Sequence, residues 1–289
     1  MAHGIVLVTG TSTGIGEATA LHLDKLGLRV FAGVRKESDA ERLSDQGSER
    51  LTPITLDVTD PEQIALAAKE IDQAAGPAGL AGLVNNAGFV AAGPLEFVPL
   101  DEVRRQFEVN VIGLLAVTQA MLPMLRTGRG RIVNVGSIAG RFSSPLTGPY
   151  HASKWAVETF TDTMRMELKP WGIHACVVEP GNIKTPLWEK SMAAAGEQLA
   201  DTPQEAIRLY EPEIEAAFRV SRKQAEIGIS PERVARRIAH ALTSSRPKTR
   251  YLVGIDAHIL AVVARWMPDR IMDSLILGQL KSKRNKSPG

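Results

Sequence analysis

The segment "TGTSTGIG" at residues 9–16 follows an apolar run at 4–10 and leads into a sequence whose apolar residues repeat at helical spacing, 14–27. Glycines at such a strand-to-helix junction let the chain turn tightly and approach a pyrophosphate. The helix N-terminus adds free N–H groups and the positive end of its dipole. The segment therefore predicts a dinucleotide-binding turn. The candidate cofactor contacts within it are Gly10, Ser12, Thr13, Gly14, Ile15 and Gly16.

The rest of the chain repeats this order of strand and helix. Further apolar, β-branched runs typical of strands lie at 29–35, 51–58, 81–88, 130–137, 173–181 and 250–254. Helical patterns between them include 61–76, which Asp60 and Pro61 open, and then 101–125 and 150–168. Continuously apolar strands that alternate with helices predict an α/β fold. We expect a doubly wound (Rossmann) parallel sheet of seven strands with helices on both faces.

The 289 residues contain no internal repeat, low-complexity tract or linker, so we expect one domain over 1–289. Two segments extend the wound core. Residues 186–230 lack strand signals and are expected to form a lid over the substrate. Residues 255–280 are predicted to form a helical C-terminal extension, a pair of apolar helices split at Pro268. The last residues, 281–289, are basic and expected to be disordered.

Composition and charge narrow the class of protein. The chain is 44% hydrophobic and 23% charged, and its formal net charge is only +2. A nucleic-acid-binding protein usually has a stronger basic bias. The single cysteine, Cys176, allows neither an intrachain disulfide nor a cysteine-based metal site, and it favours a reducing compartment. We therefore expect a cytoplasmic protein with no metal and no nucleic-acid partner.

The sequence predicts no membrane-spanning helix. The N-terminus leads from apolar residues directly into the glycine turn and is typical of a first strand rather than a signal peptide. No segment offers roughly 18 uninterrupted apolar residues. The C-terminal helices carry the charges Arg265, Asp269, Arg270 and Asp273, so they predict weak surface association at most. Packing on the sheet edge or on a partner subunit is the alternative.

Several motifs occur in one order along the chain. The glycine turn has the form T-G-x-x-x-G-x-G, "NNAG" follows at 85–88, Ser137 ends the fifth predicted strand, and "YHASK" at 150–154 lies thirteen residues beyond that serine. In this order and spacing the chain resembles the short-chain dehydrogenase/reductase family over residues 4 to about 190. The segment 250–276 is similar to the C-terminal part of retinol and 17β-hydroxysteroid dehydrogenases, and to a lesser degree of 3-hydroxybutyrate dehydrogenase.

The resemblance implies a catalytic set of Asn110, Ser137, Tyr150 and Lys154. Hydride transfer between a carbinol carbon and nicotinamide requires a proton transfer at oxygen, and a free phenol with a pKa near ~10 is a poor base at neutral pH. Lys154, one helical turn after Tyr150, is expected to lower its pKa and to bind the nicotinamide ribose. Ser137 would hold the substrate oxygen, and Asn110 would anchor a water relay to the lysine. His151 is expected to point elsewhere.

The same resemblance implies contacts along the rest of the dinucleotide. Asp57 and Val58 would lie at the adenine, although a carboxylate at a strand end also commonly caps a helix. The remaining positions surround the riboses and the nicotinamide: Asn86, Ala87, Gly88, Tyr150, Lys154, Pro180, Gly181, Ile183 and Thr185.

The end of the second predicted strand favours NADP(H) over NAD(H). An NAD site usually has an acid about ~20 residues past the glycines, whereas this chain has no carboxylate there until Glu37. Arg35 could bind a 2′-phosphate through its guanidinium, with Ser12 as a second donor. The alternative is a solvated arginine at a strand end.

Candidate substrate-lining residues suit an apolar alcohol or ketone, steroid-like first and retinoid-like second. They are Phe89, Ser137, Phe142, Leu146, Trp188 and Met192. One alternative is an NAD-dependent 3-hydroxyacyl or 3-hydroxybutyrate dehydrogenase, whose carboxylate substrate would need a basic pocket residue such as Arg141. Another is a dinucleotide-sensing binding protein without turnover. The resemblance also implies a homodimer or homotetramer built from helices 101–125 and 150–168.

Overall fold

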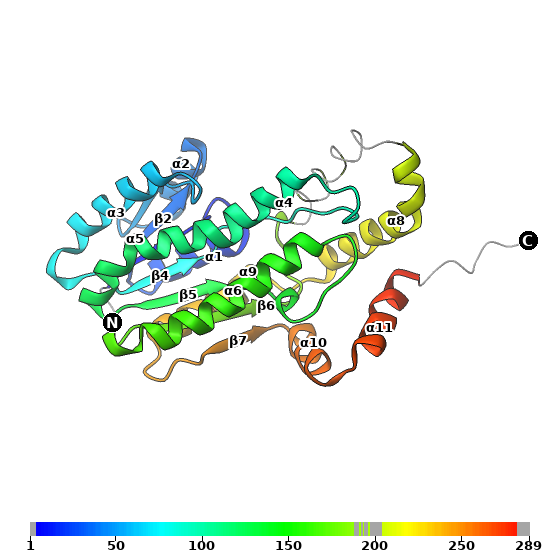
Figure 1. Cartoon of the computed structure of the whole chain (residues 1–289). Helices are drawn as coiled ribbons and strands as arrows, with labels where there is room; N and C mark the ends of the chain where they lie inside the picture. Colours follow the sequence, from blue (N-terminus) through cyan, green and yellow to red (C-terminus); the bar gives the residue numbers. More distant parts are fainter. Residues whose placement is uncertain (1–3, 188–190, 192, 194–195, 197–203, 282–289) are drawn as a thin grey trace, which may run out of the picture.

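A computed structural model describes residues 4–187, 191, 193, 196 and 204–281 of the chain. Its centre is a sheet of seven parallel strands in the order β3-β2-β1-β4-β5-β6-β7, which confirms the predicted doubly wound architecture (Figure 1). The strands are β1 Ile5–Val8, β2 Arg29–Val34, β3 Leu51–Thr55, β4 Gly82–Asn85, β5 Arg131–Val135, β6 His174–Pro180 and β7 Arg250–Val253.

Each predicted strand is present, and each is shorter than the apolar run that predicted it. The order reverses direction between β1 and β4, because β2 and β3 lie on one side of β1 and the later strands on the other. In doubly wound sheets, ligands bind at the carboxyl ends of the strands near such a switch point. The glycine turn follows β1 and therefore lies at this point.

Both faces of the sheet are buried, and neighbouring strand residues alternate between them. In β1, Leu7 faces one hydrophobic cluster, whereas Val6 and Val8 face the other. The first cluster is covered by α3 (Pro61–Ala75), α5 (Gly113–Gly128) and α6 (Gly148–Glu167). The second is covered by α1 (Gly14–Lys25), α2 (Glu37–Gln46) and α9 (Pro231–Thr243). Burial on both sides explains the continuously apolar strands.

The helix predicted over 101–125 is not one regular helix. The structure has α4 at Leu100–Phe107, a π-helical turn at Glu108–Ile112, and then α5. A π turn inserts an extra residue into a helix and often marks a functional site. Here the turn contains Asn110, whose side chain is buried. The sequence pattern missed this irregularity because one inserted residue barely disturbs helical spacing.

The same long helix, Leu100–Gly128, is long and apolar enough by composition to cross a membrane, with a mean hydropathy of 1.5 over its best window. The sequence had predicted no such segment. Half of that window is buried inside the protein, where Val117, Met121 and Leu125 pack against the sheet. Core packing accounts for its apolar character.

The two predicted additions to the wound core are helical where they are described. In 186–230 the principal element is α8 (Gln204–Ile227), and Ile229 forms a parallel bridge with Ile183. The C-terminal extension consists of α10 (Ile255–Trp266) and α11 (Asp269–Lys281), separated at Pro268 as predicted. Helix α11 packs against α8 (Figure 1). The predicted tail beyond Lys281 lies outside the described residues.

Gly16→Ala should lower the free energy of unfolding by about 1–3 kcal/mol, because a Cβ there would overlap the carbonyl oxygen of Gly10 and lie 2.5 Å from Asn86 Nδ2. Gly278→Ala on α11 is the control of opposite sign. Nothing lies within 4 Å of its added Cβ, so the better helix former should raise stability by about 0.5–1 kcal/mol. Urea unfolding without cofactor measures both. Equal midpoints for Gly16→Ala and the natural protein would contradict the packing described.

Candidate active site

The glycine turn is held against the end of β4 by a compact set of hydrogen bonds. Asn86 Nδ2 donates to the carbonyls of Thr9 (3.0 Å) and Gly10 (2.9 Å), while the backbone N–H groups of Asn86 and Ala87 donate to Thr9 Oγ1 (3.0 Å each). Gly10 has φ +66°, and a Cβ on it would lie 2.7 Å from Ala87 Cα. The side chain of Asn86 therefore fixes the shape of the turn.

The N-terminus of α1 fits a bound dinucleotide. Thr13 is the N-cap residue, and within the described chain no side chain accepts a hydrogen bond from the first-turn N–H groups. Such N–H groups bind anions. A Cβ on Gly14 would lie 3.0 Å from Thr185 Cγ2, so the turn and the loop after β6 face each other closely. The first-turn N–H groups have no side-chain acceptor and the glycines of the turn have no side chains, so a pyrophosphate has room to bind here.

The end of β2 lies beside Asp57 and the start of α3. The Arg35 side chain is 73% exposed, and its Nη1 lies 3.8 Å from Asp57 Oδ2. Asp57 Oδ1 accepts from the backbone N–H (2.9 Å) and Oγ1 (2.7 Å) of Thr59. Asp57 thus shapes the local turn, and Asp60 caps α3 as predicted by accepting from the N–H groups of Glu62 and Gln63. Val58 is buried beneath this corner.

A second guanidinium reaches the glycine turn, which the sequence analysis missed. Arg42, on α2, donates to the backbone carbonyl of Ser12 and to the carboxylate of Glu17 on α1. It also lies 3.4 Å from Asp39 Oδ1. A basic residue on a surface helix is too common to stand out in sequence, and only the packing of α2 beside the turn reveals the contact.

The structure brings Ser137, Tyr150 and Lys154 together after β5. Ser137 follows that strand and accepts from the N–H of Ala139 (3.1 Å), and its side chain lies near enough to Tyr150 to influence the pKa of that phenol. Tyr150 and Lys154 lie one turn apart on α6. Lys154 Nζ donates to the carbonyl of Val135 (2.9 Å) and lies 5.8 Å from the centroid of the Tyr150 ring.

Burial dominates the electrostatics of this pair. Desolvation raises the pKa of Tyr150, and the nearby Ser137 side chain opposes that rise. Desolvation also lowers the pKa of Lys154 to about 8. The direction for the tyrosine is opposite to the predicted one, because the cost of removing a phenolate from water exceeds the opposing effect of Ser137.

Asn110 holds the backbone of the loop after β4. Its Oδ1 accepts from the N–H of Phe89 (3.0 Å), and its Nδ2 donates to the Phe89 carbonyl (3.0 Å) and to Ser153 Oγ (3.2 Å). A Cβ on Gly88 would lie 3.1 Å from Asn110 Oδ1. Gln106, which the sequence analysis missed, donates to the same carbonyl (2.7 Å). The water relay from Asn110 to the lysine stays a prediction.

Pro180 ends β6, and the loop that follows it, which includes the predicted cofactor residues Gly181, Ile183 and Thr185, is fixed on two sides. The backbone N–H of Asn182 donates to Asp256 Oδ2 (2.7 Å), and that of Lys184 donates to the Ile229 carbonyl (2.9 Å). Asp256 begins the C-terminal extension and was also missed. The sequence does not show this contact with Asn182, because it forms only when β7 pairs with β6.

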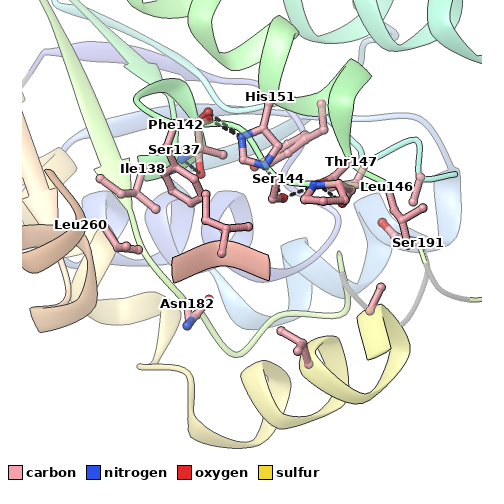
Figure 2. A pocket seen from close by; sticks show the side chains of 18 of the residues that line it. Ser137, Ile138, Phe142, Ser144, Leu146, Thr147, His151, Asn182, Ser191 and Leu260 are labelled. Carbon is pink, nitrogen blue, oxygen red and sulfur yellow. Dashed lines mark hydrogen bonds between the residues drawn. The ribbon is translucent and has the colours of Figure 1, made fainter. Parts of the chain in front are cut away.

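A pocket of about 500 Å³ opens at the end of the sheet (Figure 2). It brings together Ser137, Phe142, Leu146 and Tyr150, all predicted as catalytic or substrate-lining residues. The structure does not bring Phe89 to this pocket, because its ring lies 4.5 Å from the guanidinium carbon of Arg105 while its backbone is held by Asn110. Trp188 and Met192 lie outside the described residues.

His151 lines the same pocket, contrary to the expectation that it points elsewhere. Its side chain is buried, with Nδ1 2.9 Å from the Ala139 carbonyl and 2.6 Å from the Phe142 carbonyl. Burial lowers its pKa, although both carbonyls act in the other direction. The pocket curves around the start of α6, so two consecutive helix residues reach it.

Arg141, the basic residue considered for a carboxylate substrate, is engaged elsewhere. Its guanidinium donates to both carboxylate oxygens of Glu179, which is completely buried, with Nη2 2.8 Å from Oε1. This hydrogen bonding raises the pKa of Arg141. Among the residues described, no arginine or lysine lines the pocket, and no group of three or more His, Cys, Asp or Glu is placed to hold a metal ion.

Known proteins match this chain over nearly its whole length. The family model of the short chain dehydrogenases matches residues 4–196. Retinol dehydrogenase 5 of Mus musculus is 36% identical over 94% of this chain and 87% of its own, and 17-beta-hydroxysteroid dehydrogenase type 6 of Bos taurus is 38% identical with the same coverage. The NADPH-dependent 3-dehydrocapnine reductase of Ornithobacterium rhinotracheale is 34% identical over 97% of this chain and 99% of its own.

Solved structures give the same result. A short-chain dehydrogenase from Streptomyces avermitilis has a TM-score of 0.76 and 25% identity, covering 98% of both chains. One from Burkholderia cenocepacia in complex with NADP has a TM-score of 0.73 and 27% identity, covering 95% of this chain and 98% of its own. The chain therefore belongs to the short-chain dehydrogenase/reductase family, in the branch similar to retinol and 17β-hydroxysteroid dehydrogenases, and is an oxidoreductase that acts on CH–OH groups.

Proposed function

We propose that this protein is an NADP(H)-dependent oxidoreductase that interconverts an apolar secondary alcohol and its ketone, with a steroid-like or retinoid-like substrate. The observation that carries the proposal is the pocket at Tyr150 and Ser137. Apolar side chains such as Phe142, Leu146 and Phe218 line most of it, and no arginine or lysine lines it among the described residues. The names of the retinol and hydroxysteroid dehydrogenases similar to this chain agree with such a substrate.

In the proposed mechanism, Tyr150 moves a proton to or from the substrate oxygen, and Ser137, which lines the same pocket, holds that oxygen through its hydroxyl. A bound dinucleotide supplies or accepts the hydride. Lys154, one turn further along α6, provides a cation behind the phenol. Tyr150 and Lys154 are themselves buried, so their hydrogen bonds are stronger than they would be in solvent.

Three polar groups support the preference for NADP(H). The exposed guanidinium of Arg35 and the Ser12 hydroxyl can both donate to a 2′-phosphate, and Arg42, which is paired with Glu17 and Asp39, holds the backbone at Ser12 in place. Two similar proteins point the same way: one is named an NADPH-dependent reductase, and one was solved with NADP.

The NAD-dependent 3-hydroxyacyl or 3-hydroxybutyrate alternative is weaker. A carboxylate substrate would need a free cation in the pocket, whereas Arg141 is paired with buried Glu179. A protein that only sensed the dinucleotide would not need a catalytic set, whereas this chain brings Ser137, Tyr150 and Lys154 together.

We also propose that the chain works as one domain in the cytoplasm, as a homodimer or homotetramer joined through α4, α5 and α6. Large apolar side chains exposed on or between these helices support such an interface: Ile112, Trp155 and Met166. The buried free thiol of Cys176 is consistent with a reducing compartment.

Tyr150→Phe should lower kcat by about 10²–10⁴-fold, because phenylalanine retains the ring but cannot transfer a proton. The assay measures turnover of steroid ketones, retinal and long-chain ketones with NADPH and with NADH. Tyr210→Phe is the matched control, since that hydroxyl donates to Glu96 at the surface (2.9 Å) and should be dispensable. A Tyr150→Phe enzyme that keeps most of its activity would remove the catalytic assignment.

Lys154→Met should change how stability depends on pH. The pKa of Lys154 in the folded protein, about 8, lies below the ordinary value of 10.5. As the pH rises between these two values, the free energy of unfolding of the natural protein should therefore increase by about 1.4 kcal/mol per pH unit relative to that of the variant. The free-energy cost of burying the charged amine is fully present below pH 8 and absent above pH 10.5. Urea unfolding from pH 7 to about 10 measures the difference, with Lys69→Met on the exposed face of α3 as control. A difference that stays flat with pH would contradict the burial.

Arg35→Asp should reduce the ratio of kcat/KM for NADPH to that for NADH by at least about tenfold, because it removes a donor to the 2′-phosphate and adds a like charge. Arg29→Asp makes the same charge change at the other end of β2, where the guanidinium lies over Phe31 (5.4 Å), and should leave the ratio unchanged. An equal ratio in the Arg35 variant and the natural enzyme would refute the proposed phosphate contact.

A further inference from the structure

A small group of polar side chains interrupts the otherwise apolar pocket. Ser144, Thr147 and His151 lie side by side on its wall, and Figure 2 shows them linked in a chain. Ser144 Oγ lies 2.8 Å from Thr147 Oγ1 and 2.9 Å from His151 Nε2. The proposed chemistry at Tyr150 uses none of these three groups.

The surroundings of His151 determine which ring nitrogen carries the proton. Nδ1 faces two carbonyl oxygens, those of Ala139 (2.9 Å) and Phe142 (2.6 Å), and a carbonyl can only accept. Nδ1 must therefore carry hydrogen. Burial favours the neutral ring, so Nε2 is an acceptor and the Ser144 hydroxyl donates to it.

The two hydroxyl protons are then used within the group. Ser144 gives its proton to His151 Nε2, and Thr147 can give its proton to Ser144 Oγ or, over a longer distance of 3.5 Å, to the Pro145 carbonyl. What remains for the cavity is oxygen lone pairs. This part of the wall therefore accepts hydrogen bonds and does not donate them.

The group lies close to the reacting end of the pocket. The His151 ring centroid is 6.2 Å from that of Tyr150, and the two rings meet edge to face. A substrate that reaches Tyr150 therefore also lies beside the wall that carries Ser144, Thr147 and His151. On another wall, the pocket is lined by the carboxylate of Asp256, which also disfavours an anion.

Building on the proposed function, we propose that Ser144, Thr147 and His151 form a subsite for a second polar group of the substrate, a hydroxyl or an amine that donates a hydrogen bond. The substrate class is thereby an apolar ketone or alcohol with a donor group next to the reacting carbon. An ether, a second carbonyl or a carboxylate at that place has no proton to donate. Its oxygen would face the oxygen lone pairs of the wall, and both would be left without a hydrogen bond.

The test uses three ketones that differ at one neighbouring carbon: a hydroxymethyl ketone, its methoxymethyl ether and the parent methyl ketone. Each is prepared on a decyl chain and on a steroid skeleton. The natural enzyme should prefer the hydroxymethyl ketone over the ether in kcat/KM by about tenfold. Ser144→Ala and, as a second variant that retains the shape, Thr147→Val should bring that ratio towards one while the parent ketone is still reduced.

Ser191→Ala is the matched control. Ser191 also lines the pocket, but its hydroxyl donates to the Leu187 carbonyl at 2.7 Å, so the preference for the hydroxymethyl ketone should persist. An enzyme that reduces these ketones but shows the same ratio in Ser144→Ala and Thr147→Val overturns the subsite alone. Absence of turnover for all six ketones with either cofactor overturns the proposed function and the subsite with it.

Discussion

The close contact between the glycine turn and the end of β4 is the constraint on which the site depends. No side chain fits at Gly10 or Gly16, because the space is filled by Ala87 and by the carbonyl and amide groups that Asn86 joins. From there a continuous path leads to the catalytic helix. Gly88 leaves room for Asn110, whose Nδ2 reaches Ser153 Oγ, and that hydroxyl donates to the backbone carbonyl of Tyr150 (2.7 Å). The cofactor turn and the proposed acid/base are thus positioned by one set of hydrogen bonds.

Desolvation sets the chemistry of the tyrosine and lysine. In water the tyrosine is a phenolate only above a pH of about 10 and the lysine is an ammonium at any pH below about 10.5, and burial opposes both charges at once. The pair is therefore held nearer to its neutral forms, with Ser137 the side chain that most favours the phenolate. A positively charged ring beside Lys154 would favour the phenolate further. It follows that the free protein and its complex with an oxidised dinucleotide differ in the acidity of Tyr150.

The sequence predicted the architecture well because each strand is buried on both faces, and because the turn needs positive φ at Gly10 and Gly14, which glycine adopts readily. Helical spacing placed Tyr150 and Lys154 on one face, whereas the resemblance to the family added Ser137 to that pair. It failed where tertiary packing decides the outcome. The π turn at Asn110, the contact of Arg42 with the turn, and the hold of Asp256 on Asn182 each join segments whose approach no local pattern encodes. His151 was misplaced for the same reason.

Ion pairing explains why no arginine or lysine among the described residues lines the pocket, although Arg141 adjoins the pocket residue Phe142. Arg141 and Arg250 both bind Glu179, and Arg250 also binds Glu158 on α6. Buried cations need such partners, since an unpaired one costs far more than the pair. Once these carboxylates hold both guanidiniums, neither can bind a substrate anion. Asp256 on one wall disfavours an anion, and on the wall formed by Ser144, Thr147 and His151 the hydroxyl and ring protons are already used. On that wall, selectivity between neutral substrates depends on hydrogen-bond direction.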